Sequence, residues 1–344
     1  MMNIEVIDDI LDCQQVIKQM QLPKELHNKK VAHDNEIADI ITGVSNKFLL
    51  LIGPCSAHNE DAVVDYACRL AKLQELYKDK LKMILRVYTN KPRTTGAGYK
   101  GLLHQPDPEK DSNPSEGVLA IRKMHLRVLK DSGLPTVDEM LYPENYVYLA
   151  DLLSYVAVGA RSTENQQHRM VASGISLPVG IKNPTSGDIN VMMNSIQAAQ
   201  TGHEFVYRLQ AIRSFGNPLA HAILRGAVNK NGASIPNYHY EDLKHTVNLY
   251  KTRNFKNPAI IVDTNHDNSG KRHTEQPRIV KEIMANRLWD EALYTAIKGL
   301  MIESFIEEGR QDIGTGNIYG KSITDPCLGW EQTEELVHNI AKHA

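Results

Sequence analysis

Four side chains that can bind a transition metal follow apolar segments of the sequence. An apolar run ends at a Gly-Pro pair, and Cys55 directly follows that pair. His266 stands in "DTNHDNSG", Glu303 in "MIES" and Asp325 in "SITDPCLGW". A thiol, an imidazole and two carboxylates suit a divalent ion such as Mn, Fe, Co or Zn better than Ca or Mg. We therefore expect these residues to hold such an ion, which would deprotonate the thiol.

Taken singly, these residues also have structural explanations. A buried cysteine is usually a small hydrophobic residue, His266 could cap a turn, and Asp325 could initiate the turn at Pro326. Glu303 is harder to explain in this way, because a carboxylate at the end of an apolar run needs a partner. The metal hypothesis therefore depends on all four residues meeting at one place.

A second group of residues is cationic. The segment "RVYTNKPRTTGAGYKG" contains Arg86, Lys91 and Arg93. Three further cations follow later apolar runs: Arg161, Lys182 and Arg225. Lys and Arg are usually solvated surface residues, but these lie at or near the ends of apolar segments. Guanidinium groups match phosphate and carboxylate oxygens, so we expect ligands that together carry more than one phosphate.

The elements that must position these residues are short apolar runs alternating with amphipathic stretches. We expect strands at residues 48–52, 83–88, 135–140, 155–160, 178–183, 204–209, 259–265 and 299–304. Eight β and α units fit a (β/α)8 barrel, in which the carboxyl ends of all strands meet at the face that carries active sites. A doubly wound open sheet is the alternative, but it would spread the candidate residues along an edge. We therefore predict an α/β TIM barrel.

The chain divides into two predicted parts. Residues 48–344 form the catalytic barrel, and residues 1–47 form an N-terminal helical extension. Apolar residues at helical spacing predict helices at residues 4–20 and 31–44. This extension could close the bottom of the barrel, pack on another subunit, or act as a regulatory arm.

Composition narrows the class of protein. A net charge of −2 over 344 residues argues against a nucleic-acid-binding surface. The four cysteines are irregularly spaced and predict no disulfide framework. The acidic N-terminus lacks the features of a secretory signal, and no apolar stretch approaches the roughly 18 residues of a membrane span. We expect a cytoplasmic protein without membrane or nucleic-acid partners.

Several ordered motifs resemble one enzyme family. "GPCS", "RVY" with "KPRTT", "GARSTE" with "QQHR", "PVGIKN", "ILRG", "NHDNS", "MIES" and "SITDPCLGWE" resemble the type I, α-subgroup synthases of 3-deoxy-D-arabino-heptulosonate 7-phosphate (DAHP). The likeness covers nearly the whole chain. It implies a TIM-barrel transferase that condenses phosphoenolpyruvate with erythrose 4-phosphate and water, releasing phosphate, in the first step of the shikimate pathway to chorismate and the aromatic amino acids.

The resemblance also implies roles for individual residues. The family's metal ligands match Cys55, His266, Glu303 and Asp325. Its phosphoenolpyruvate site matches Arg86, Lys91, Glu139, Arg161, Lys182 and Arg225. Arg93 and Thr94 match its erythrose 4-phosphate contacts. Lys91 is our candidate for the proton donor, with His266 as the alternative. A homodimer or homotetramer and an aromatic amino acid effector are implied as well.

The sequence departs from the family pattern at three places. Asp267 replaces the usual small residue after the histidine, which could alter the outer shell of the metal. "RGA" replaces "RGG" and an added "VNKNGAS" stretch follows. The segment 208–223 differs from the family's feedback-sensing hairpin, so we expect weak or unusual inhibition by Phe, Tyr or Trp. Two rival functions are an octulosonate phosphate synthase, for which "KANRS"-like residues would replace "KPRT", and a non-catalytic sensor barrel.

Overall fold

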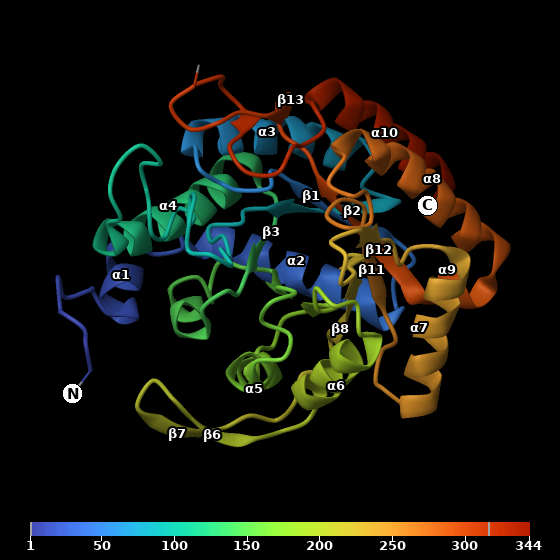
Figure 1. The fold of residues 1–344 in the computed structure, drawn as a ribbon, viewed down its shortest axis with the longest axis horizontal. Helices are drawn as coiled ribbons and strands as arrows, with labels where there is room; N and C mark the ends of the chain where they lie inside the picture. The colour runs from blue at the N-terminus through green and yellow to red at the C-terminus, as the bar shows by residue number, and fades with distance from the viewer. Residues whose placement is uncertain (1, 316) are drawn as a thin grey trace.

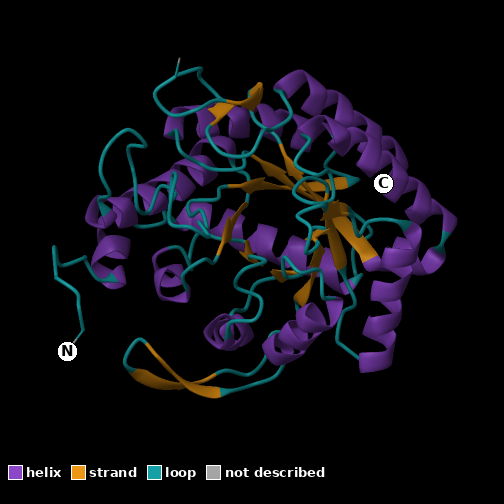
Figure 2. Ribbon diagram, viewed as in Figure 1, coloured by secondary structure: helices purple, strands orange, loops and turns teal. Residues whose placement is uncertain are grey.

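Eight parallel strands close into a barrel at the centre of the molecule (Figures 1 and 2). The structure is a computed structural model that describes residues 2–315 and 317–344. The barrel strands are β1 (Phe48–Gly53), β2 (Leu81–Arg86), β3 (Thr136–Glu139), β4 (Tyr155–Val158), β5 (Val179–Lys182), β8 (Ala220–Leu224), β11 (Ile260–Asp263) and β12 (Ile297–Glu303). Around the barrel they follow the order β1-β12-β11-β8-β5-β4-β3-β2. The predicted TIM barrel is confirmed.

Helices cover the outside of the strands (Figure 2). They are α3 (Glu60–Leu76), α4 (Pro114–Ser132), α5 (Gln166–Gly174), α6 (Ile189–Gln200), α7 (Tyr240–Arg253), α8 (Gln276–Trp289), α9 (Glu291–Ala296) and α10 (Trp330–His343). The 3-10 helix η1 (Pro143–Tyr148) takes the place of a full helix between β3 and β4, and η2 (His273–Glu275) leads into α8. Every barrel strand except the start of β12 is buried along its whole length, because one face lines the interior and the other packs under helices.

Two helices precede the barrel, α1 (Cys13–Gln19) and α2 (Lys24–Thr42). Helix α2 contributes Ile37, Ile40 and Ile41 to the buried cluster that also contains Leu49 and Leu51 of β1. These three isoleucines are at most 1% exposed. Helix α2 is therefore part of the core of the barrel, whereas the residues before α1 leave several apolar side chains exposed, including Met2 and Ile4.

The N-terminal helices differ from the predicted ranges. The expected helix at residues 4–20 forms only as α1, because Asp12 caps it by accepting hydrogen bonds from the backbone N–H groups of Gln14 and Gln15. The expected helix at residues 31–44 begins seven residues earlier, where Pro23 precedes the first turn, and ends at Gly43 in the left-handed conformation.

The prediction for the sixth barrel strand was wrong. The segment 204–209 does form a strand, β6 (Glu204–Tyr207), but it pairs with β7 (Gln210–Arg213) in a hairpin that projects from the barrel (Figure 1). Its alternating exposed and half-buried residues are typical of a sheet that has one face exposed to solvent. The sixth barrel strand is instead β8, a segment for which we expected no strand.

Short strand pairs lie in the loops after β8 and β12. Strands β9 (Ala227–Val228) and β10 (Ser234–Ile235) pair antiparallel after β8, and β13 (Glu307–Arg310) pairs with β14 (Lys321–Ser322) after β12. Among the described residues, no helix has both the length and the apolar character needed to cross a membrane.

Candidate active site

The candidate residues lie at the carboxyl ends of the barrel strands. Four of them are the last residues of β2, β3, β5 and β12, namely Arg86, Glu139, Lys182 and Glu303. Cys55 lies two residues beyond β1, Arg225 directly follows β8, and Arg161 and His266 each lie three residues beyond a strand end. Because the strands are parallel and the barrel is closed, all these ends share one face, which we call the mouth.

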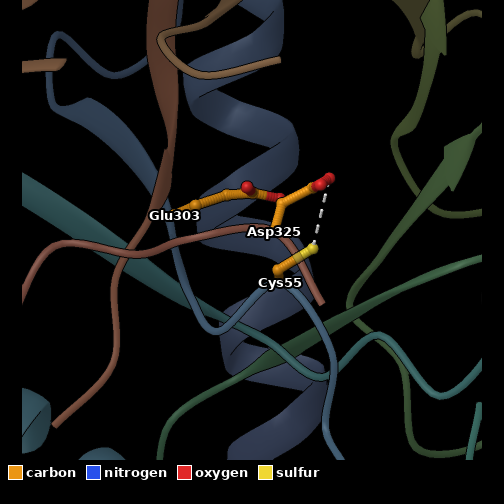
Figure 3. A group of neighbouring side chains, drawn as sticks. All are labelled: Cys55, Glu303 and Asp325. Carbon is orange, nitrogen blue, oxygen red and sulfur yellow. Dashed lines mark hydrogen bonds between the residues drawn. The ribbon is translucent and has the colours of Figure 1, made fainter. Parts of the chain in front are cut away.

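Cys55, Glu303 and Asp325 form a cluster of metal-binding atoms at this mouth. One donor atom from each residue lies within 4.8 Å of the other two, and Figure 3 shows the side chains pointing toward one another. Sγ of Cys55 is 3.8 Å from Oδ2 of Asp325. The loop that carries Asp325 is fixed by Leu328, whose backbone N–H donates to the carbonyl of Glu303 at 3.0 Å. The cluster therefore combines one sulfur and two carboxylate groups from three separate segments.

His266 lies beside this cluster. Its Nε2 atom is 3.8 Å from Oε1 of Glu303, and its Nδ1 atom is 2.8 Å from Oδ2 of Asp263. The backbone of His266 has a φ of 47°, the left-handed region that costs energy for a residue other than glycine. The contact with Asp263 orients the imidazole so that its other nitrogen faces Glu303, which is the arrangement that metal-binding histidines usually have.

Burial and charge act in opposite directions on these groups. Burial, together with the charge of Glu303, raises the pKa of the Cys55 thiol to about 11, although Lys91 acts to lower it. The Nζ atom of Lys91 donates to Sγ of Cys55 at 3.0 Å. Burial lowers the pKa of Lys91, but the neighbouring Cys55 and Glu303 outweigh it and raise that pKa above its usual value. In the absence of an ion the thiol is therefore neutral and Lys91 is charged.

Arg86 is a fully buried cation with unused donors. It pairs with Glu303 at 2.8 Å, and its guanidinium lies 4.3 Å from the centre of the Tyr88 ring. The Nε and Nη1 atoms of Arg86 have no hydrogen-bond partner within the described part of the chain. Because a buried N–H group without a partner is costly, these donors favour an anionic ligand. Burial acts to raise the pKa of Glu303, but His266 and Arg86 lower it well below its usual range.

Lys182 and Glu139 form a second buried pair. Nζ of Lys182 is 3.5 Å from Oε2 of Glu139 and 3.9 Å from Oδ2 of Asp263. A Cβ atom at Gly159 would lie only 2.3 Å from Oε1 of Glu139, so a glycine at this position makes room for the carboxylate. Burial acts to raise the pKa of Glu139, but the cations Lys182 and Lys91 lower it, so that the carboxylate is charged.

Arg225 is paired with Asp267, the residue that departs from the family pattern directly after His266. Its Nη1 atom is 2.5 Å from Oδ2 of Asp267. Asp267 is the residue that could alter the outer shell of a metal ion, and its carboxylate contacts the cation at the end of β8. The structure therefore places Asp267 in the cationic part of the mouth.

The remaining candidates lie on exposed loops at the rim. Nε of Arg161 donates to Oγ1 of Thr94 at 3.0 Å, and Nε of Arg93 donates to the carbonyl of Tyr99 at 2.8 Å. Arg161 thus connects the loop after β4 to the segment 91–98 after β2.

Three polar residues of the mouth were missed by sequence reasoning. Asp263 contacts His266 and Lys182, Asn265 donates through Nδ2 to Oε2 of Glu303 at 2.5 Å, and the Tyr88 ring lies beside three cations. A signal for Asp263 was available, because it ends an apolar run as Glu303 does. The fold and this mouth define a (β/α)8-barrel enzyme whose site joins a metal-ligating cluster to buried cations.

Comparisons with known proteins identify the family. Residues 18–338 match the model of the DAHP synthetase I family. The chain is similar to a Trp-sensitive phospho-2-dehydro-3-deoxyheptonate aldolase of Enterobacter agglomerans, with 38% identity over 313 residues, 89% of this chain and 86% of the relative. It is also similar to a phospho-2-dehydro-3-deoxyheptonate aldolase of Haemophilus influenzae, with 37% identity over 98% of this chain and 92% of the relative.

A solved structure agrees with these relatives. The structure of phospho-2-dehydro-3-deoxyheptonate aldolase from Francisella tularensis SCHU S4 superimposes with a TM-score of 0.91 and 30% identity, covering 99% of this chain and 98% of that one. The chain belongs to the DAHP synthetase I family. The predictions of this family and of a transferase, a DAHP synthase, are confirmed.

Proposed function

We propose that the protein condenses phosphoenolpyruvate with erythrose 4-phosphate and water to give DAHP and phosphate, with a divalent metal ion at the mouth. Family membership supports the reaction. The observation that carries the site assignment is the contact between the metal-ligating cluster and the buried cations, above all Arg86, which pairs with Glu303 and keeps two buried N–H donors free.

The chemistry of the donor set fits a metal ion. Cys55, Glu303 and Asp325 would bind it, and His266 would complete the set from its position beside Glu303. Mn, Fe, Co and Zn all accept sulfur, nitrogen and oxygen ligands together. An ion held there would supply Lewis-acid chemistry at the carbonyl oxygen of the aldehyde.

The cations hold the two anionic substrates in the proposed reaction. Arg86, Lys182 and Arg225, with Lys91 and Arg161, bind the phosphate and carboxylate oxygens of phosphoenolpyruvate, while Glu139 keeps Lys182 in place. Arg93 and Thr94 bind erythrose 4-phosphate on the rim. Holding two mutually repelling molecules in reactive geometry is a large part of the catalytic task.

In the proposed reaction, the methylene carbon of phosphoenolpyruvate forms a bond to the aldehyde carbon, and water adds to the neighbouring carbon. The C–O bond to phosphate then breaks and a ketone forms; one water proton restores Lys91 and the other leaves with the phosphate. Lys91 donates a proton to the oxygen of the former aldehyde. Its Nζ atom lies beside the metal-ligating cluster, 3.0 Å from Sγ of Cys55, where the aldehyde oxygen would be placed. His266 is the alternative donor.

The assembly and regulation of the protein are also part of the proposal. We infer a cytoplasmic homodimer or homotetramer in which the N-terminal extension, residues 1–47, contributes to assembly or regulation. The exposed apolar residues Val206, Leu209 and Phe215 near the β6–β7 hairpin support a subunit contact there. Since several relatives are named Trp-sensitive, tryptophan is the effector to test first.

Release of inorganic phosphate from phosphoenolpyruvate tests the reaction. The assay compares erythrose 4-phosphate with arabinose 5-phosphate in the presence of Mn. Phosphate release with erythrose 4-phosphate alone is the expected result. Release with arabinose 5-phosphate alone would identify an octulosonate phosphate synthase, and no release with either aldose would favour a sensor barrel.

A further inference from the structure

Arg225 differs from the other buried cations of the mouth in the kind of carboxylate that faces it. Glu303, the partner of Arg86, belongs to the metal-ligating cluster, and Glu139, the partner of Lys182, ends a barrel strand. Asp267, the partner of Arg225, belongs to neither group. Its Oδ2 atom lies 2.5 Å from Nη1 of Arg225, close enough for an ion pair, although that nitrogen has no well-aligned hydrogen bond among the described residues.

The backbone and side chains around Asp267 are built to keep its carboxylate at Arg225. Its backbone N–H donates to the carbonyl of Arg225 at 3.2 Å, and Oγ of Ser234 donates to its Oδ1 atom at 3.0 Å. Gly226 has a φ of 76°, and a Cβ atom there would lie 2.5 Å from the carbonyl carbon of Asp267. A side chain at Gly226 would therefore push the two segments apart.

Both partners are nearly inaccessible to solvent, since Arg225 is 6% and Asp267 is 4% exposed. A buried negative charge at this distance is weakly screened, so it affects any second anion that binds the same guanidinium. The proposed function places an anionic oxygen of phosphoenolpyruvate on Arg225, and the next inference depends on that assignment. The oxygen then meets a guanidinium whose charge is already partly compensated.

We propose that Asp267 is a positioning residue that acts through the Arg225 guanidinium: it partly compensates the charge of this group and so weakens its binding of phosphoenolpyruvate and of the released phosphate. Ser234, which donates a hydrogen bond to the Asp267 carboxylate, lies in β10, so the position of this carboxylate also depends on the β9–β10 hairpin. Asp267 thus sets the affinity of the phosphoenolpyruvate subsite without contacting erythrose 4-phosphate.

The test is neutralisation of Asp267 in the full-length, metal-loaded enzyme. In Asp267→Asn the KM for phosphoenolpyruvate should fall about fivefold or more, because removal of a unit charge beside a buried anion is a large effect at low effective dielectric. The Kd for inorganic phosphate, measured by calorimetry without other substrates, should fall in parallel, while the KM for erythrose 4-phosphate stays unchanged. Asp267→Glu, which keeps the charge, should restore the wild-type phosphate affinity.

Two further variants serve as controls. Glu334→Gln removes one charge from the exposed side of α10 and should change neither constant. Asp267→Ser provides a second neutral variant if Asp267→Asn does not fold, with thermal unfolding as the check. A folded neutral variant whose phosphate affinity is unchanged or weaker would overturn the inference. If Asp267 only held the Arg225 side chain in place, its replacement would disorder the guanidinium and weaken phosphate binding.

Arg225→Ala separates this inference from the proposed function. If Arg225→Ala raises the KM for phosphoenolpyruvate but neutral Asp267 variants do not lower it, only the role of Asp267 is overturned. If Arg225→Ala has no effect on phosphoenolpyruvate or phosphate binding, the assignment of Arg225 to the substrate fails, and the role of Asp267 fails with it.

Discussion

The Nζ atom of Lys91 lies 3.0 Å from Sγ of Cys55, so the proposed proton donor directly contacts a proposed metal ligand. The two residues come from different loops, after β2 and after β1. Since burial raises the pKa of the Cys55 thiol to about 11, the charge of Lys91 alone does not ionise it at neutral pH. Metal binding at Cys55 would supply the missing ionisation and change the electrostatic environment of the proton donor.

Metal removal should therefore abolish activity without unfolding the barrel. Chelation is expected to stop phosphate release, and Mn, Co or Fe should restore it. Cys55→Ala should lose most activity and retain a cooperative thermal transition, because it removes one sulfur atom from a large apolar cluster that stays otherwise intact. Cys68→Ala, on the outer helix α3, is the matched control. Normal turnover of the chelated enzyme would contradict the metal assignment.

The rim residues should distinguish the two substrates. Arg93→Ala should raise the KM for erythrose 4-phosphate more than that for phosphoenolpyruvate, by about tenfold or more, because a hydrogen bond to a charged group contributes about 1.5–3 kcal/mol. Arg161→Ala should do the reverse. Because Arg161 donates to Thr94, that variant should also produce a small increase for erythrose 4-phosphate, and Thr94→Val, which removes a proposed contact with that substrate, should produce a larger one.

Steady-state kinetics with each substrate varied in turn provides the measurement. Lys100→Ala, on the exposed part of the same loop, is the control for general disturbance of the segment. Equal changes in both KM values for Arg93→Ala and for Arg161→Ala would refute the division of the cations between two subsites.

The sequence predicted the location of a charged residue correctly wherever that residue stands at the end of a fully apolar run. Such runs must be buried on both faces, and parallel strands in a closed barrel bring their ends together, so Arg86, Lys182 and Glu303 could be placed at one face. The sixth strand was missed because His221 makes β8 look polar. In the structure the imidazole is buried and Nε2 lies 2.7 Å from the hydroxyl of Tyr155, a contact between distant segments that spacing does not reveal.

The pairing of Arg225 with Asp267 was unpredictable for the same reason. The two residues follow different strands, and only the close approach of their backbones at Gly226 brings the charges together. Asp263, in contrast, stands at the end of an apolar run and could have been included by the rule that was applied to Glu303.

The N-terminal extension should contain two parts with different effects on stability. Removal of residues 1–10, whose described apolar side chains are exposed, should leave the free energy of unfolding nearly unchanged. Ile40→Ala in α2 should lower it by about 2–5 kcal/mol, because a buried isoleucine side chain is lost from a packed core. Denaturant unfolding measures both free energies, that of the truncated protein and that of Ile40→Ala. Lys29→Ala, at an exposed position of α2, is the control. A neutral Ile40→Ala would contradict a core role for α2.

The buried His221 should make stability depend on pH independently of the metal site. Its Nε2 atom faces the Tyr155 hydroxyl at 2.7 Å and its Nδ1 atom lies 2.8 Å from the carbonyl of Leu219, so the neutral imidazole has both partners that it needs. Burial lowers the pKa of His221 from 6.5 to about 4. Between these values the unfolded state binds the extra proton, so stability is fully present above pH 6.5 and falls as the pH falls towards 4.

The expected loss is on the order of 1 kcal/mol by pH 5.5 and about 3 kcal/mol by pH 4. His221→Gln keeps a polar side chain but does not titrate, so the difference in unfolding free energy between the wild type and this variant isolates the histidine from the other groups of the protein that titrate over this pH range. Urea unfolding at pH 7.5, 6.5 and 5.5, at constant ionic strength, measures this difference. Tyr155→Phe, in which the histidine still titrates, should keep the pH dependence of the wild type. A wild-type minus His221→Gln difference that stays constant across this range would contradict the lowered pKa, because it would mean that the imidazole titrates in the folded protein as it does in the unfolded chain.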